Sequence, residues 1–344
     1  MSLKDLYDSI YKDSERWSYY NQLNIVSNPF EKPDDFIKEY FLLSEKAGLL
    51  KEEFSNYLKK ESKKRARHTV SVFFLGIYLK DFLNIEDKDF FPDFRYLWFL
   101  TSLYHDIGYF YEETNTKDKD FGAEITCLKD VDFNPPFSFD IVKKYFSYRI
   151  KEFSCTDHGI ASGCEIYKKL KELLEEAKQN GLKEENGDYH YNGLKWNDSQ
   201  INTFKKIASA IVRHNIWFCS DIEKIKTYEE MGLRDLIVHK DQDKIKFSKE
   251  DGLFFLLALA DTIEPLKHFG NNPVNLERIN LKTDGRKIII NRTNFSLQGC
   301  ARKLFECRWE KWSEKISGLE KWLQVKVEKE KEKDSIEILL KTDS

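Results

Sequence analysis

The sequence has few of the features that mark secreted, disulfide-bonded or membrane-spanning proteins. Its six cysteines are scattered over 344 residues without a C-x-x-C pair, which argues against a disulfide framework and a zinc knuckle. The first residues, MSLKDLYDSIYKDSERW, lack the apolar stretch of a signal peptide. The longest apolar run, GLFFLLALA, is far shorter than the roughly 20 residues that span a bilayer. We therefore expect a cytoplasmic protein without a membrane partner.

An excess of charge of one sign is also lacking. The formal net charge is −3, so the chain as a whole does not attract nucleic acid, although local basic stretches exist. No G-x-S-x-G elbow, Walker A loop or Cys–His signature is present, which argues against a protein nucleophile or a P-loop. Hydrophobic residues make up 41% of the chain and aromatic residues 15%, which is enough for a substantial core.

Helical periodicity dominates the first 275 residues, and strand-like alternation appears after them. The predicted fold class is mainly α, a helical bundle with a small C-terminal α+β appendage of antiparallel strands. We expect an N-terminal helical extension over 1–50 that packs on the core, a central domain over 51–275, and an α+β subdomain over 276–344. Residues 112–153 are expected to form a long insertion and 180–198 a polar loop. Capping-box spacing predicts helices that begin near Ser154 and Ser248.

Six polar side chains stand on apolar helix faces, each close to a helix end: His68, His105, Asp106, His158, His214 and Asp261. Asp261 is the most informative of them, because it lies on the stripe of Phe254 and Leu257, where a carboxylate without partners is costly. A single such histidine is more often a hydrogen-bonded core residue, and a single such aspartate is more often a cap or half of an ion pair. Six such residues together favour the interpretation that they bind metal.

Four imidazoles and two carboxylates form a mixed nitrogen and oxygen ligand set. Such a set suits Mn²⁺, Fe, Co, Ni or Zn²⁺, with Mg²⁺ as a further candidate, better than a Ca²⁺ cage. Six ligands exceed what one tetrahedral zinc needs. The set fits two divalent metals if one carboxylate bridges them, and Asp106 is the natural bridge because its neighbour His105 is also a ligand.

The order His68, His105-Asp106, His158, His214 and Asp261 resembles the HD superfamily of metal-dependent phosphohydrolases, and more closely the subset with two additional histidines. The likeness covers about residues 60–265, and its most specific pieces are HDIG and DHGIASG. The second piece is similar to an element of HD nuclease domains in CRISPR effectors. The resemblance implies a core of about five helices around two metals.

The resemblance also implies a role for each ligand. One metal would be held by His68, His105, Asp106 and Asp261, and the second by His158 and His214 with Asp106 shared. Asp106, His105 and His158 would carry catalysis, which in the family is hydrolysis of a phosphomonoester or phosphodiester. Two cations about 3.5–4 Å apart would supply a hydroxide at neutral pH and neutralise charge on the phosphoryl oxygens.

The sequence departs from the family pattern around the substrate. Many HD phosphodiesterases read HDIGK, whereas Tyr109 stands in the place of that lysine. Lys64 and Arg65, one turn before His68 in the stretch KKESKKRAR, are candidate phosphate clamps or part of a solvated helix face. Arg213 is a candidate substrate contact or a surface arginine. The extension typical of deoxynucleotide triphosphohydrolases, HDIGHPPFGH, is lacking, which argues against that substrate class.

Several functions fit these residues. The first is hydrolysis of a small phosphorylated substrate such as a nucleotide. A nuclease acting on single-stranded nucleic acid is a variant that the basic stretch leaves open. The second is a mixed-valent di-iron oxygenase, because an HD branch that resembles inositol oxygenase has the same ligand order. The third is a non-enzymatic nucleotide sensor, against which the complete ligand set argues.

Overall fold

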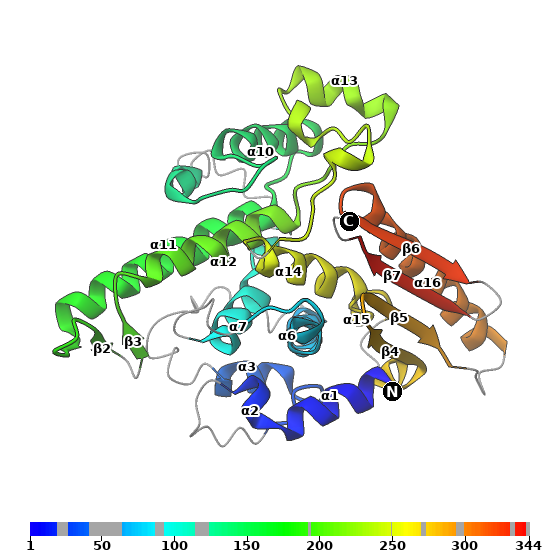
Figure 1. Ribbon diagram of the computed structural model, residues 1–344, viewed down its shortest axis with the longest axis horizontal. Helices are drawn as coiled ribbons and strands as arrows, with labels where there is room; N and C mark the ends of the chain where they lie inside the picture. Colours follow the sequence, from blue (N-terminus) through cyan, green and yellow to red (C-terminus); the bar gives the residue numbers. More distant parts are fainter. Residues whose placement is uncertain are drawn as a thin grey trace.

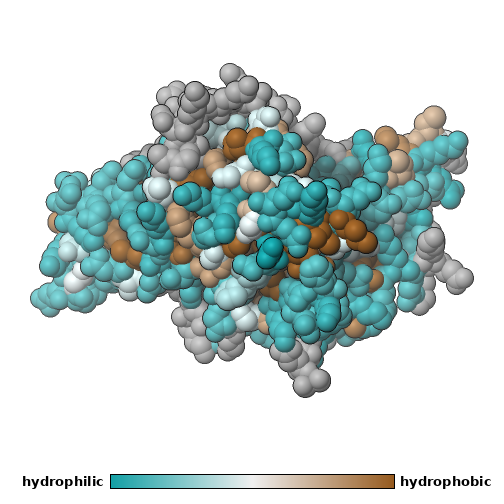
Figure 2. Space-filling model, turned by 90° about the horizontal axis from the view of Figure 1, so that it is seen from above, coloured by the Kyte–Doolittle hydropathy of each residue, from teal (hydrophilic) through white to brown (hydrophobic). Residues whose placement is uncertain are grey.

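The computed structural model describes residues 1–18, 27–40, 64–86, 93–113, 124–191, 194–248, 250–269, 273–293, 299–330 and 334–341. Within these residues the chain is mainly helical, with two small antiparallel sheets, which confirms the predicted fold class (Figure 1). Every helix within these ranges is too short or too polar to cross a membrane. Hydrophilic residues cover most of the face seen in Figure 2, with hydrophobic residues showing between them.

Five helices form the centre of the molecule and pack on one another: α6 (Lys64–Phe82), α7 (Phe94–Tyr104), α11 (His158–Asn180), α12 (Gln200–His214) and α14 (Gly252–Ile263). The long helices α11 and α12 run side by side (Figure 1). Gly163 allows this close approach, because a Cβ atom there would lie 2.4 Å from a methyl group of Val212. Helix α7 begins after Asp93, whose side chain accepts a hydrogen bond from the amide of Arg95.

The N-terminal helices α1 (Leu3–Lys12), α2 (Ser14–Trp17) and α3 (Pro33–Tyr40) pack on α6. Aromatic rings join these helices to the bundle: Trp17 packs against Phe74 of α6, and Tyr40 stacks on Phe99 of α7 with ring centroids 3.7 Å apart. Within the described part of the expected extension, the chain is therefore helical and rests on the central bundle. Residues 19–26 and 41–50 lie outside the described ranges.

The stretch expected as an insertion contains more regular structure than the sequence suggests. After α8 (Tyr109–Glu113) and residues 114–123, which lie outside the described part, come the 3₁₀ helix η2 (Ile125–Asp130) and helix α10 (Phe139–Phe153). The helix expected near Ser154 is α11 (His158–Asn180), but Ser154 is not its cap. Ser154 instead ends α10 with a left-handed backbone (φ 53°), and Asp157 caps α11 by accepting the amide of Ile160.

The expected polar loop over 180–198 is also more ordered than predicted. The described part forms a three-stranded antiparallel sheet of β1 (Leu182–Lys183), β2 (Tyr189–Tyr191) and β3 (Leu194–Trp196). Strands of two or three residues are too short to show periodicity in the sequence. The helix expected near Ser248 begins at Gly252, and Ser248 Oγ accepts the amide of Asp251 just before it. Between α12 and α14 lie α13 (Ile222–Glu230), η3 (Arg234–Leu236) and η4 (Asp241–Asp243).

The C-terminal part combines the predicted strands and helix. After α15 (Leu266–Phe269) and η5 (Pro273–Arg278), the antiparallel strands β4 (Ile279–Asp284), β5 (Lys287–Arg292), β6 (Val325–Glu330) and β7 (Ser335–Leu340) form a sheet in the order β4-β5-β7-β6. Helix α16 (Gly299–Gly318) and η6 (Leu319–Lys321) lie between β5 and β6 in the chain. One continuous hydrophobic core joins this part to the bundle, from Leu3 to Ile338.

Candidate metal centre

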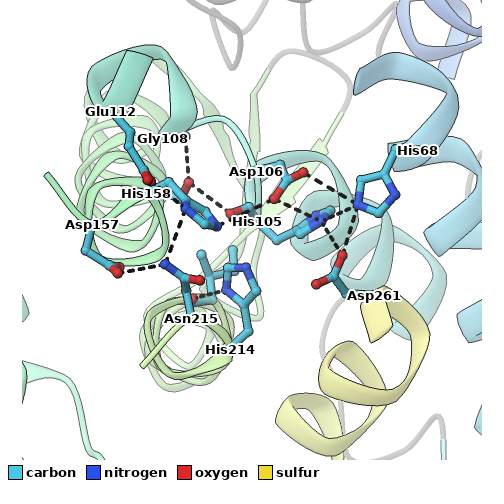
Figure 3. Close-up of polar contacts among 12 residues, drawn as sticks. His68, His105, Asp106, Gly108, Glu112, Asp157, His158, His214, Asn215 and Asp261 are labelled. Carbon is cyan, nitrogen blue, oxygen red and sulfur yellow. Dashed lines mark hydrogen bonds and ion pairs between the residues drawn. The ribbon is translucent and has the colours of Figure 1, made fainter. Parts of the chain in front are cut away.

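The six predicted ligands come together at one place, where the ends of the central helices meet (Figure 3). His158 is the first residue of α11 and His214 the last of α12, while His105 and Asp106 directly follow α7. His68 lies in the second turn of α6, and Asp261 lies near the end of α14. Four of the six residues thus lie in helices and two in the turn after α7, and the packing of these helices brings them together from distant parts of the sequence.

The six side chains form two groups. His68, His105 and Asp261 place one ligand atom each within 4.8 Å of one another, and so do Asp106, His158 and His214. In the first group, His68 Nε2 lies 3.2 Å from His105 Nε2 and 3.0 Å from Asp261 Oδ1. These separations suit atoms that share one ion as ligands.

Asp106 lies between the two groups. Its Oδ2 atom is 3.5 Å from His68 Nε2, whereas its Oδ1 atom is 3.4 Å from His105 Nε2 and 3.7 Å from His158 Nε2. Asp106 Oδ1 is buried and has no hydrogen-bond partner among the described residues. An unpartnered buried carboxylate oxygen that faces two imidazole nitrogens is the arrangement expected of a bridging metal ligand.

The Nδ1 atom of every histidine in the set has an acceptor next to it. His68 Nδ1 lies 2.8 Å from Glu264 Oε2, and His158 Nδ1 lies 2.8 Å from Glu112 Oε2. The main-chain oxygen of Ser102 accepts from His105, and that of Ile211 accepts from His214. A proton held on Nδ1 leaves the lone pair on Nε2, and each Nε2 is then the atom available to a metal. The donor set therefore fits two divalent ions.

Two glutamates in this arrangement were missed by the sequence reasoning. Glu264 follows Asp261 by one helical turn, but its partner His68 lies 196 residues earlier. Glu112 is held by Arg149 of α10, whose guanidinium donates to Glu112 Oε1 at 3.0 Å. Nothing in the local sequence distinguishes Glu112 from a surface charge. Glu264 stands between the apolar residues Ile263 and Pro265 in the sequence, which is a weak signal of burial.

The loop that carries His105 and Asp106 is held against α11 by close packing. The amide of Gly108 donates to Ser162 Oγ at 2.8 Å, and Ser162 Oγ donates to the carbonyl oxygen of His105. A Cβ atom on Gly108 would lie 2.1 Å from the carbonyl oxygen of His158. The glycine of HDIG and the small residues of GIASG thus set the distance between Asp106 and His158.

Burial opposes the charge of Asp106, but neighbouring basic groups outweigh it and hold the pKa of this carboxyl well below its usual range. These groups are His105, Lys267, His68 and Arg65. The carboxylate is therefore ionised at neutral pH, as a metal ligand must be.

We expect the apparent metal affinity of the first group to rise about tenfold per pH unit between pH 7 and pH 9. Burial lowers the pKa of His68, but its hydrogen bonds to Asp261 and Glu264 outweigh burial and raise it to about 9. At pH 7 the metal-free protein therefore carries a proton on His68 that the metal must displace. Burial lowers the pKa of His214 to about 3, so His214 adds no further proton in this range.

Calorimetric titration of Mn²⁺ in buffers of different ionisation enthalpy measures this effect. About one proton should be released as the first group fills at pH 7. The release should be lost in His68→Gln, and an affinity that does not change between pH 7 and pH 9 would contradict the prediction.

Of the candidate substrate contacts, Arg65 and Tyr109 lie beside the metal ligands, whereas Arg213 does not. Arg65 NH1 donates to Asp106 Oδ2 at 2.9 Å, and its guanidinium lies 3.6 Å from the centre of the Tyr109 ring. Tyr109 in turn stacks on the His158 ring at 3.7 Å. Both residues therefore border the centre. The side chain of Lys64 lies outside the described part of the chain.

Arg213 is neither a surface arginine nor directed at the metal ligands. Its side chain is buried, forms an ion pair with Asp251, and lies over the ring of Phe254. Asp157, next to His158, caps α11 and also accepts a hydrogen bond from Asn215 at 2.7 Å.

The comparisons with known proteins assign no family to this geometry. No family model, curated protein or solved structure matched the chain. What the centre can do therefore has to be judged from the six ligands and the side chains around them.

Proposed function

We propose that the protein is a metal-dependent phosphohydrolase that hydrolyses a phosphate ester, of a nucleotide or in a phosphodiester, at a dinuclear metal centre. The observation that carries the proposal is Asp106, whose carboxylate lies between the two groups, with Oδ2 near His68 of the first group and Oδ1 near both His105 of the first and His158 of the second. A single-metal site would not require the second histidine pair, His158 and His214. The resemblance of the ligand order to the HD superfamily supports the same activity.

Two divalent ions, when bound at such a centre, supply an activated water and neutralise charge on phosphoryl oxygens. The residues of the chain prepare the site for that chemistry. Glu264 and Glu112 keep the Nδ1 protons of His68 and His158 in place, which leaves each Nε2 atom as a ligand. Arg65, stacked on Tyr109, directs guanidinium N–H groups into the centre, where they can hold a phosphoryl oxygen.

The proposal is tested with the full chain after removal of metals with a chelator. Reloading with Mn²⁺, Co²⁺ or Ni²⁺ should give about two ions per chain and restore hydrolysis of at least one of three substrate classes. These are p-nitrophenyl phosphate, cyclic dinucleotides and single-stranded DNA. A protein that binds two ions but hydrolyses none of the three would contradict the proposal.

The oxygenase alternative predicts a different result in the same preparation. Iron-loaded protein would then show the electron paramagnetic resonance signal of a mixed-valent pair and would consume O₂. We expect neither, because a hydrolase needs no change in the oxidation state of its metals.

A further inference from the structure

Two cations lie against the carboxylates of the metal centre. Arg65 contacts Asp106, and Lys267 of α15 places its Nζ atom 3.2 Å from Asp261 Oδ1. The side chain of Asp106 is only 4% exposed, whereas those of Arg65 and Lys267 are 18% and 28% exposed. An anion arriving from solvent can therefore meet these two cations beside the buried ligands.

A third cation comes from the C-terminal part of the chain. Helix α16 packs on α15: the Trp312 ring lies 5.4 Å from the Phe269 ring, and the Arg308 guanidinium donates to the Phe269 carbonyl oxygen. Lys315 follows Trp312 by about one turn, and part of its side chain is exposed to solvent. The packing of α16 on α15 brings Lys315 to the side of the bundle that carries Lys267. Partial burial and the charge of Lys267 both lower the pKa of Lys315.

While metals are absent, the carboxylates of the centre face basic side chains of the chain. Arg65 and Lys267 then pair with Asp106 and Asp261, and Glu264 pairs with His68. Two divalent ions would bring four positive charges to carboxylates that already face Arg65 and Lys267. The remaining positive charge favours a multiply charged anion as the bound ligand.

Phosphate esters differ in how much of this charge they can neutralise. A phosphodiester carries one negative charge, whereas a phosphomonoester carries about two at pH 7. Di- and triphosphates carry more. Lys267 and Lys315 would also contact phosphoryl oxygens beyond the one at the metals. The position of Tyr109, in place of the lysine of HDIGK, leaves this task to cations from other elements.

We propose that Arg65, Lys267 and Lys315 form an anion-binding flank that selects phosphate monoesters and polyphosphates over singly charged phosphodiesters. The inference rests on the proposed function and narrows its substrate class. It also gives the C-terminal part a role, because α16 positions Lys315 next to α15. The residues were not recognisable together in the sequence, since Arg65 and Lys315 lie at opposite ends of it.

Binding of inorganic phosphate to the full chain at saturating Mn²⁺ tests the flank without turnover. Lys267→Gln should weaken phosphate binding about 10- to 100-fold, because it removes a charged hydrogen bond. The more exposed Lys315→Gln should weaken it a few-fold. Lys303→Gln, an exposed lysine three turns earlier in α16, serves as the matched control and should leave phosphate binding unchanged.

Hydrolysis distinguishes this inference from the proposed function. The native protein should cleave p-nitrophenyl phosphate with a higher kcat/KM than bis(p-nitrophenyl) phosphate, and Lys267→Gln should lower only the first value. Faster cleavage of the diester, or phosphate binding that Lys267→Gln leaves unchanged, would overturn the inference alone. If the protein bound two metals and cleaved neither ester, while phosphate binding still depended on Lys267, the proposed hydrolysis would be overturned and the anion-binding flank would stand.

Discussion

Replacing Asp106 by asparagine should remove most of the bound metal and lower phosphate ester hydrolysis by at least about 10³-fold. The reason is the position of its two oxygens, one toward His105 and His158 and the other toward His68. Asparagine keeps the shape but replaces one oxygen with an amide nitrogen, which cannot bind a cation. It also removes the negative charge that both groups share.

The measurement is the metal content of dialysed protein beside the rate of ester hydrolysis. We expect about two ions per chain in the native protein and fewer than one in Asp106→Asn. Asp235→Asn is the matched control, because Asp235 is exposed and lies outside the centre. If Asp106→Asn retained two ions and full turnover, the assignment of the whole ligand set would be wrong.

Replacing Gly108 by alanine should destabilise the protein by about 3 kcal/mol and weaken the second metal group more than the first. The new Cβ atom would lie 2.1 Å from the carbonyl oxygen of His158 and 2.9 Å from Ser162 Oγ. Because the carbonyl belongs to the backbone, the loop or the start of α11 has to move. That movement changes the distance between Asp106 and His158, which is 3.7 Å in the structure.

Urea unfolding of the metal-free protein measures the loss of stability, and calorimetric titration measures the two metal affinities. We expect a drop of about 10- to 100-fold in the affinity of the second group, as when a supporting contact of a ligand is lost. Gly318→Ala is the control, since a Cβ atom there meets nothing within 4 Å. Equal stability of the two variants would show that the packing at Gly108 is not tight.

The candidate ligands could be brought together from the sequence because most of them have a local signal. His68, His214 and Asp261 break the apolar stripes of their helices, and His105 and Asp106 interrupt the end of an apolar run. A polar side chain in such a place has to find a partner, which makes it visible without a structure. The mainly helical fold was visible for a similar reason, because helices of a dozen or more residues repeat their pattern several times.

The residues around the ligands had no such signal. Glu112, Glu264 and Lys267 are charged residues in a chain that has many, and their roles depend on contacts with residues far away in the sequence. Arg213 shows that a position next to a ligand in the sequence does not place a side chain at the centre. It stands next to the ligand His214, but consecutive residues on a helix point about 100° apart, and its side chain pairs with Asp251 instead.

The sequence by itself determined the fold class and singled out the six candidate ligands, because both follow from local periodicity and from the cost of burying a charge. Only the tertiary structure decided how the ligands divide into two groups, which nitrogen of each histidine faces the centre, and which cations border it. These properties depend on distances between helices that are remote in the chain. Asp106 is an example of both. Its burial was visible in the sequence, but its place between the two groups depends on how α7, α11 and α6 pack.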